Sequence, residues 1–213
     1  VFLTKSEAVQ TAQAAVSIAK ASSKAKKKPV ALTPSESRKG KYATKMKKDP
    51  FKVPLDEKID VLLHAERTIA GQSDLIKSSS AFFRAFRENK FFMSTEGAEI
   101  SQQITWCGGG LEGVAVRNGD VQRRSFPASF RGNFSTSGYE FFESLALSDH
   151  AKQVGQEAVK LLDAEKCAPA ELDLILTGDQ LALQIHESCG HPTELDRALG
   201  MEADYAGTSF LVP

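Results

Sequence analysis

Alternating apolar and polar residues from about Leu75 to Phe126 restrict the possible folds more than any other feature of this sequence. The stretch EISQQITW alternates around Ile100, Gln102, Ile104 and Trp106, which is the pattern of a half-buried β-strand. The stretch VAVRNGDVQRR places Asn118-Gly119 between two such runs and predicts a tight hairpin. Aromatic residues on both sides of Glu88-Asn89 predict another turn at that dipeptide. We therefore expect an antiparallel meander in the middle of the chain.

Apolar residues at helical spacing lie on both sides of the meander. Thr4 and Glu7 predict a capping box for a first helix that runs to about Ala21. Further helices are predicted at residues 55–70, 138–145 and 148–164, the last with Ser148 as its N-cap. The stretch LDLILTG is typical of a short buried strand, and Gly178-Asp179 follows it at the start of another helix. The predicted fold class is α+β: helices packed on a mainly antiparallel sheet, then the start of a second domain that opens with a strand and a metal-binding helix.

Two features of the chain resemble binding elements but have simpler interpretations. Gly108–Gly110 is not followed by Lys-Ser or Lys-Thr, so a phosphate loop is unsupported and a bulge or bend is expected. Residues 21–50 contain ten Lys or Arg against two acidic residues, with three prolines. We interpret this segment as a solvated linker. The alternative is a patch that binds nucleic acid or another polyanion, but Tyr42 is its only aromatic residue and offers little for base stacking.

Charge and cysteine content exclude little about partners. The sequence has 27 basic and 27 acidic residues, so its net charge favours neither nucleic acid nor an anionic membrane. No apolar run approaches the roughly 20 residues of a membrane helix, and no signal-peptide pattern opens the chain. Three cysteines form an odd and sparse set, which makes a disulfide framework unlikely and predicts a reducing compartment.

The stretch HESCGHPTELDR contains the strongest candidate for chemistry. His186 and His191 are five residues apart, whereas zinc-peptidase helices space their histidines by four. On a regular helix five residues turn a side chain about 140° from the starting face. Gly190 can leave helical geometry cheaply, and Pro192 disfavours helical geometry at the residue before it. We therefore expect the helix to end at or just before His191, through an i→i+5 turn that returns His191 beside His186.

This arrangement predicts a zinc site. Two neutral imidazoles are good zinc ligands, and Glu187 could accept a proton from water activated by the metal. The alternative is a pair of buried or capping histidines, which is how we interpret the isolated His64 and His150. Cys189 could reach the metal but is more typical of a small packing residue.

Glu194 and Asp196 have two open interpretations. They could accept a hydrogen bond from the second nitrogen of a metal-binding imidazole and so fix its tautomer. Alternatively, the stretch ELDR opens a helix, with both acids near its positive end and Arg197 as their ion-pair partner.

The stretch HESCGHPTELDR, followed by LGMEADYAGTSFL, resembles the TldD-like members of the TldD/PmbA family of metallopeptidases. DPFKVP, STEGAEISQ, RRSFP and GYE agree with this resemblance. It implies a cytoplasmic, zinc-dependent peptidase that hydrolyses peptides or unfolded polypeptides and forms a homo- or hetero-oligomer with a TldD/PmbA-type subunit. It also implies that His186 and His191 bind zinc, that Glu187 is the general base, and that a third ligand, a Cys, lies beyond Pro213.

The same resemblance implies a domain division and suggests a piece of a longer protein. Residues 1–168 correspond to most of the N-terminal domain, and residues 169–213 to the beginning of the C-terminal metallopeptidase domain. The isolated polypeptide is expected to bind zinc weakly and to hydrolyse no peptide, unless Cys189 or Cys167 completes the site. It is also expected to expose apolar residues of LDLILTG and TSFLVP. The alternative function is a non-catalytic subunit or interaction module.

Overall fold

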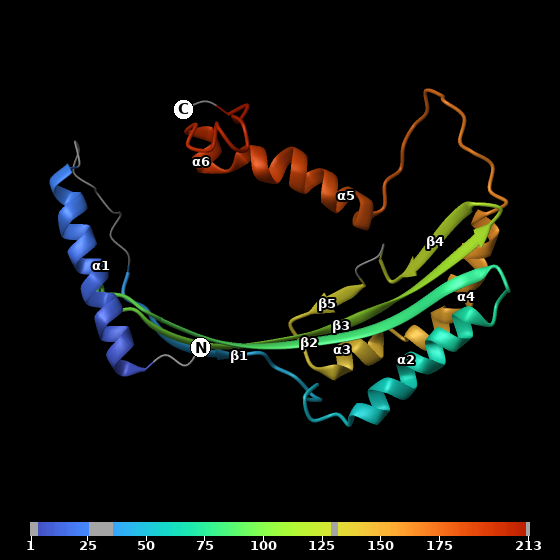
Figure 1. Ribbon diagram of the computed structural model, residues 1–213, viewed down its shortest axis with the longest axis horizontal. Helices are drawn as coiled ribbons and strands as arrows, with labels where there is room; N and C mark the ends of the chain where they lie inside the picture. Colours follow the sequence, from blue (N-terminus) through green and yellow to red (C-terminus); the bar gives the residue numbers. More distant parts are fainter. Residues whose placement is uncertain (1–3, 26–35, 129–131, 212–213) are drawn as a thin grey trace. The chain divides into compact units, whose positions relative to one another are not determined.

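The computed structural model describes residues 4–25, 36–128 and 132–211. The chain forms two compact units, one of Val1–Lys39 with Met93–Glu99 and one of Gly40–Phe92 with Ile100–Pro213. Helices lie on a mixed, mostly antiparallel five-stranded sheet, as Figure 1 shows for the second unit. The predicted α+β fold class is thereby confirmed.

The first unit contains helix α1 (Lys5–Ala25) and the tip of a long hairpin. The predicted capping box is present: Glu7 N–H donates to Thr4 Oγ1 at 3.2 Å, and Thr4 N–H donates to Glu7 Oε2 at 2.9 Å. Every residue of α1 is exposed. Part of the predicted basic linker, residues 26–35, lies outside the described residues. Its later part forms a strand, β1 (Lys39–Ala43).

Strand β3 (Glu99–Arg117) is the centre of the sheet and pairs with each of the other four strands. Its neighbours are β1, β2 (Ile76–Met93), β4 (Asp120–Phe126) and β5 (Asn133–Ser135). The Asn118-Gly119 hairpin between β3 and β4 is confirmed, since both residues have positive φ angles, 53° and 86°. This is the conformation that a two-residue hairpin turn requires.

The turn predicted at Glu88-Asn89 is wrong, because β2 runs through these residues without interruption. Asn89 Oδ1 instead accepts a hydrogen bond from Gln103 Nε2 on β3 at 3.0 Å. The chain reverses after Met93, where Ser94 N–H donates to Ala98 O at 3.2 Å. A hydrogen bond from the neighbouring strand therefore satisfies the side chain of Asn89, a residue type that by itself suggested a turn.

The glycines of β3 are explained by close packing within a continuous strand, rather than by the expected bulge or bend. A Cβ atom on Gly108 would lie 2.0 Å from the carbonyl oxygen of Asn133, and one on Gly109 would lie 2.2 Å from that of Phe82. Side chains at these positions would separate β3 from its neighbours, so glycine is what allows the strands to approach.

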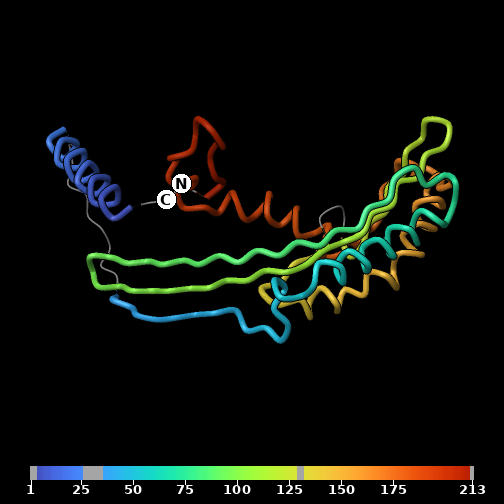
Figure 2. The backbone as a smooth tube through the Cα atoms, turned by 60° about the horizontal axis from the view of Figure 1, so that its bottom comes forward, coloured from blue at the N-terminus to red at the C-terminus, as the bar shows by residue number. Residues whose placement is uncertain are grey.

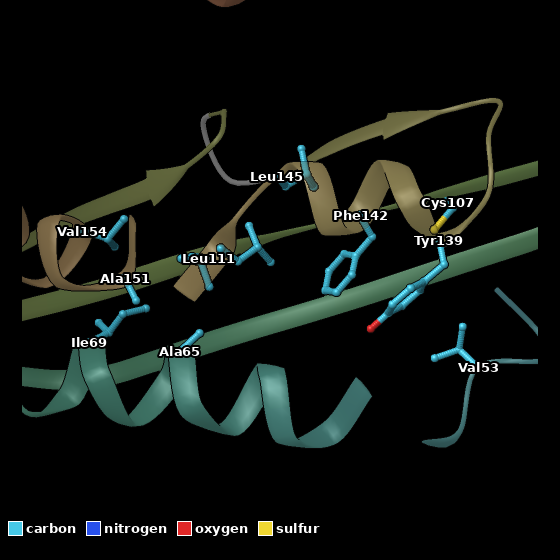
Figure 3. Close-up of a cluster of buried hydrophobic side chains, with 11 residues drawn as sticks. Val53, Ala65, Ile69, Cys107, Leu111, Tyr139, Phe142, Leu145, Ala151 and Val154 are labelled. Atoms are coloured by element: carbon cyan, nitrogen blue, oxygen red, sulfur yellow. The ribbon is translucent and has the colours of Figure 1, made fainter. Parts of the chain in front are cut away.

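Helices α2 (Leu55–Ala70), α3 (Tyr139–Ser144) and α4 (Leu147–Leu161) cover one face of the sheet (Figure 1). The bounds predicted for α2 are confirmed. Ser148 is not the N-cap of α4, because the helix begins one residue earlier, after Ala146 with φ 47°. Side chains from all three helices meet β3 in one buried cluster, in which Tyr139 and Phe142 are prominent (Figure 3). The Phe83 ring of β2 closes this cluster, with its centroid 4.9 Å from that of Phe142.

Glu140, in the first turn of α3, fastens the segment before α2 to this core. Its carboxylate accepts hydrogen bonds from the backbone N–H groups of Lys47 and Lys48, each at 3.0 Å. Burial by itself would raise the pKa of Glu140, but these backbone donors, with those of Gly138 and of Glu140 itself, lower it to about 2. The carboxylate is therefore charged at neutral pH and acts as an anchor.

The chain beyond α4 differs from the layers before it. Residues 163–190 are all exposed, and the strand predicted at LDLILTG is absent. Leu174 and Ile175 are 78% and 95% exposed, in line with the expected exposure of this apolar segment. A strand requires a neighbour for its backbone groups, and no other described strand pairs with this segment. Helix α5 (Gly178–Ile185) follows. None of the helices described in this structure is both long and apolar enough to span a membrane.

Candidate metal centre

Helix α5 continues into a π-helical turn, η1 (His186–Gly190), and then a 3₁₀ turn, η2 (His191–Thr193). The N–H of His191 donates to the carbonyl oxygen of His186, which closes an i→i+5 ring. This is the turn that the five-residue spacing predicted. The extra residue in the ring rotates His191 back toward the face of His186.

The backbone geometry of the turn differs from the expectation in one respect. Gly190 and His191 keep right-handed helical angles, with φ near −60° at both, and the chain leaves helical geometry only at Glu194, where ψ is 134°. The expected end just before His191 is confirmed, since η1 ends at Gly190, but the expected change of backbone angles at His191 is wrong. The reason lies in the hydrogen bonds: Pro192 has no N–H to continue the i→i+4 series, and Thr193 Oγ1 instead donates to Cys189 O at 2.7 Å.

The two imidazole rings lie together, with centroids 4.3 Å apart and planes at 79°. Ligand atoms of His186, Glu187 and His191 all lie within 4.8 Å of one another. Two imidazoles and a carboxylate form a donor set that suits zinc. Among the described residues neither Cys167 nor Cys189 belongs to this group.

Each imidazole has a carboxylate beside its Nδ1 atom. His186 Nδ1 lies 2.9 Å from Glu187 Oε1, and His191 Nδ1 lies 3.2 Å from Glu194 Oε1. When Nδ1 carries the proton and donates it to the carboxylate, Nε2 keeps a free lone pair. The carboxylates thus favour the tautomer in which both histidines present Nε2 to a cation.

The Glu187 carboxyl is held in its charged form. The hydrogen bond from His186 lowers its pKa, and the nearby Arg197 lowers it further, so the group is a carboxylate at neutral pH, although a weaker base than a free glutamate. Its side chain is 58% exposed, so water reaches it. Glu187 therefore stands both beside His186 and in contact with solvent.

The cluster opens into a cleft of about 930 Å³ that Glu187 and His191 share with the residues after them. Asp196 lines this cleft but binds neither imidazole; its Oδ1 accepts a hydrogen bond from the N–H of Arg197 at 2.8 Å. Arg197 forms no ion pair with any described residue, and its Nε atom is buried without a hydrogen-bond partner. Each interpretation is therefore correct in part. Glu194 contacts an imidazole and Asp196 does not. Helix α6 (Leu195–Ala198) begins directly after Glu194, as the second interpretation expects, but Arg197 pairs with neither acid in the part of the chain that the structure describes.

Glu202 is a candidate that the sequence did not single out. Its carboxylate lies with those of Glu194 and Asp196 in a second group whose ligand atoms are within 4.8 Å of one another. The N–H of Met201 donates to Asp196 O at 2.8 Å and folds the chain back at this point. No periodic pattern marks such a fold, so the sequence held no signal for Glu202.

The other two histidines are remote from this chemistry. The ring of His150 stacks on Phe126 with centroids 3.8 Å apart. Within the part of the chain that the structure describes, neither His64 nor His150 joins a metal-ligating group. His150 thus has a packing role, but His64 is exposed in the middle of α2, so the buried or capping role expected for it is wrong.

Comparison with known proteins gives a family match and several relatives. The model of the PmbA/TldA metallopeptidase central domain matches residues 48–163, which include the core but not the histidine cluster. A metalloprotease of Methanocaldococcus jannaschii is 28% identical over 151 residues, 71% of this chain and 32% of that protein. Metalloproteases of Archaeoglobus fulgidus and Methanothermobacter thermautotrophicus are 22% and 24% identical over 76% and 75% of this chain, and 35% and 34% of their own lengths. The chain thus spans about a third of the length of the curated relatives it matches.

Proposed function

Since this chain belongs to the PmbA/TldD metallopeptidase family, we propose that it is part of a zinc-dependent peptidase that hydrolyses peptides or unfolded polypeptides. The π turn carries this proposal, because it brings His186, Glu187 and His191 within 4.8 Å of one another. A spacing of five residues would separate the two imidazoles on a regular helix. A chain that served only to pack this helix would gain nothing from the altered turn.

Each residue of the cluster has a proposed task. His186 and His191 bind the zinc ion through Nε2, and the third ligand is the Cys that the family resemblance implies. A bound zinc ion would supply Lewis acidity and lower the pKa of water. Glu187 takes the proton of the attacking water, and Glu194 holds the imidazole of His191 in its Nδ1–H tautomer.

The alternative is a non-catalytic subunit of a TldD/PmbA-type complex. The exposure of the cluster is the observation that favours it, since the side chains of His186 and Glu187 are 59% and 58% exposed. A peptidase usually excludes bulk water from its reacting atoms. Metal content and turnover distinguish the two functions.

The experiment compares three variants of the full-length protein. His186→Ala and His191→Ala should each lose zinc, since each removes a ligand. Glu187→Gln should keep its zinc and lose at least about 100-fold in peptide hydrolysis, since it removes only the proton acceptor. His64→Ala is the matched control, because His64 is an exposed histidine of α2 outside the cluster, and it should keep both metal and activity.

Elemental analysis and turnover of an unstructured peptide are the two measurements. Equal zinc in the parent and both histidine variants would contradict the ligand assignment. Normal turnover by zinc-loaded Glu187→Gln would remove Glu187 from the mechanism. Tight zinc without turnover in the parent protein would favour the non-catalytic alternative.

A further inference from the structure

Arg197 is a half-buried cation that lines the cleft beside the histidine cluster. Its guanidinium forms no ion pair with any described residue, and its Nε atom is buried without an acceptor. Proteins seldom leave a buried donor in this state, because the hydrogen bond that it loses with water is not replaced. The side chain is therefore a donor that needs an acceptor from whatever enters the cleft.

Three acidic side chains line the same cleft, and none of them pairs with Arg197. Glu194 Oε1 lies 3.2 Å from His191 Nδ1, and Asp196 Oδ1 accepts a hydrogen bond from the backbone N–H of Arg197 at 2.8 Å. The carboxylate of Glu202 groups with these two acids, within 4.8 Å of both. The acids are thus held by other contacts, and the guanidinium stays available to a ligand.

Local structure fixes Arg197 relative to the histidine cluster. α6 begins directly after Glu194, so Arg197 lies about one helical turn after the acid that contacts His191. The N–H of Met201 donates to Asp196 O at 2.8 Å, and the chain turns back on itself here, as the red end of the tube shows in Figure 2. The position of the guanidinium therefore depends on the same short segment that orients the imidazole of His191.

The charges around the cleft show what a cation would do there. Four acidic side chains line the cleft, those of Glu187, Glu194, Asp196 and Glu202. A negative charge that develops on a substrate in this cleft would be repelled by them. Arg197 is the only Lys or Arg among the described residues that line it, and a guanidinium keeps its charge at every working pH. It is therefore the side chain that offsets this repulsion.

We propose that Arg197 donates hydrogen bonds to the carbonyl oxygen of the scissile peptide bond and stabilises the negative charge that this oxygen gains in the transition state. This role rests on the peptidase function proposed above. A carbonyl oxygen is present at every peptide bond, so the contact suits unfolded substrates of varied sequence. Hydrogen bonds from a cation strengthen as the acceptor becomes charged, so Arg197 assists the reaction more than it assists binding.

The step in which Arg197 acts is the attack of water on the carbonyl carbon. Glu187 takes one proton of the water as its oxygen bonds to the carbon, and the electron pair of the C=O double bond moves onto the carbonyl oxygen. The guanidinium of Arg197 faces the charge formed there. When the C–N bond breaks, the pair returns to form C=O, and the leaving amine takes the proton from Glu187.

A free C-terminal carboxylate is the other acceptor that suits the planar fork of an arginine. A substrate with that group would bring a full negative charge into a cleft lined by four acidic side chains before any bond reacts. The scissile carbonyl oxygen is neutral until the attack begins. The acidic lining of the cleft therefore favours the carbonyl oxygen as the ligand of Arg197.

The first test measures kcat and KM of the zinc-loaded, full-length protein with an unstructured peptide whose C terminus is amidated. Arg197→Gln should lower kcat at least about 100-fold, the cost of one lost oxyanion donor, and change KM less than about threefold, because the carbonyl is neutral in the ground state. Arg197→Lys keeps the charge and should recover at least about tenfold of the lost kcat. Arg67→Gln is the matched control, since Arg67 is an exposed residue of α2, and it should keep kcat.

The second test has a readout other than turnover. In the inactive Glu187→Gln protein, a phosphinate peptide places negatively charged oxygens where the scissile carbonyl would lie. Adding Arg197→Gln should raise its Kd at least about tenfold and that of the unmodified peptide less than about threefold. Calorimetric titration measures both constants. Zinc content should stay equal, and the melting temperature should not fall, because Arg197 is neither a ligand of the metal nor part of an ion pair among the described residues.

Four results would overturn the proposal, each in a different way. Normal kcat in zinc-loaded Arg197→Gln, while Glu187→Gln is inactive, would remove Arg197 from the reaction and leave the peptidase function intact. A rise of KM only for peptides with a free C-terminal carboxylate would make Arg197 an anchor for that group. A lower melting temperature with equal loss of both ligands would show that Arg197 pairs elsewhere in the full-length protein. A parent protein without turnover would contradict the peptidase function itself, and the role of Arg197 with it.

Discussion

Side chains are held in place by different means in two regions of the chain, residues 48–163 and residues 164–211. The first region fixes its side chains by burial, with Tyr139 and Phe142 only 1% and 3% exposed. The second region has no fully buried residue among those described. Its histidines are instead oriented by hydrogen bonds between nearby residues, such as that of His191 N–H to His186 O and that between His191 Nδ1 and Glu194 Oε1.

This difference predicts which property a substitution in each region should alter. In a packed core, the loss of even one methyl group lowers the free energy of unfolding of the whole unit. In a turn held by local hydrogen bonds, a substitution changes only the orientation of the side chains on that turn. Core substitutions should therefore alter unfolding, and substitutions around η1 should alter metal affinity with little change in unfolding.

The largest expected effect comes from the core. Phe142→Ala removes a ring that contacts both Phe83 and Tyr139, and should lower the free energy of unfolding by about 3–5 kcal/mol. Leu183→Ala is the matched control in the second region, since Leu183 on α5 is 66% exposed and should change stability by less than about 0.5 kcal/mol. Urea denaturation measures both. A comparable loss for Leu183→Ala would show that α5 is covered in solution, and the contrast between the regions would fail.

The sequence predicted those features that depend on neighbouring residues. The bounds of α2 and the Asn118-Gly119 turn follow from local spacing and turn residues. The π turn also follows from local signals, since a Pro at position 192 removes the N–H that a regular helix needs. The α+β class followed from the order of these elements.

Features that depend on distant partners escaped prediction. β2 continues through Glu88-Asn89 because Gln103 on β3 supplies a hydrogen bond, and no local pattern reports that partner. The stretch LDLILTG has the composition of a strand, but pairing decides strand formation. Glu202 enters the cleft through an irregular turn after Gly200, where φ is 71°. These are tertiary effects that a single sequence does not encode locally.

Glu140 offers a test of intermediate size within the first region. Glu140→Gln should lower the free energy of unfolding at pH 7 by about 2 kcal/mol, because hydrogen bonds to a charged acceptor are lost. The folded pKa lies at about 2, below the ordinary value of 4.5. The stabilisation by Glu140 is therefore complete above pH 4.5 and lost as the pH falls toward 2. Denaturation at several pH values checks this: the difference between parent and variant should shrink below pH 4.5, and a constant difference would contradict the anchor role.

Pro192 tests the second region. Pro192→Ala restores an N–H at position 192, which can donate to Ser188 O and continue a regular α-helix. His191 would then rotate about 140° away from His186, and zinc affinity should fall at least about tenfold. Competition with a fluorescent chelator measures the affinity in the full-length protein. Pro169→Ala, in the exposed segment before α5, is the control and should bind zinc like the parent. Unchanged affinity in Pro192→Ala would mean that Pro192 does not maintain the π turn.

Gly190 gives the smallest expected effect and tests why the turn forms. Its φ is −58°, an angle that alanine also prefers, and a Cβ atom there would meet His186 Cδ2 only at 3.9 Å, an ordinary contact. Gly190→Ala should therefore change zinc affinity less than about twofold, and the lower entropy of the unfolded chain should slow hydrogen exchange of the His191 N–H slightly. Gly108→Ala is the contrasting variant, because its Cβ atom would lie 2.0 Å from Asn133 O and should destabilise the sheet. If Gly190→Ala instead lost zinc as strongly as Pro192→Ala, the metal-bound turn would need a backbone conformation that only glycine adopts easily, and the hydrogen-bond explanation of the five-residue spacing would be incomplete.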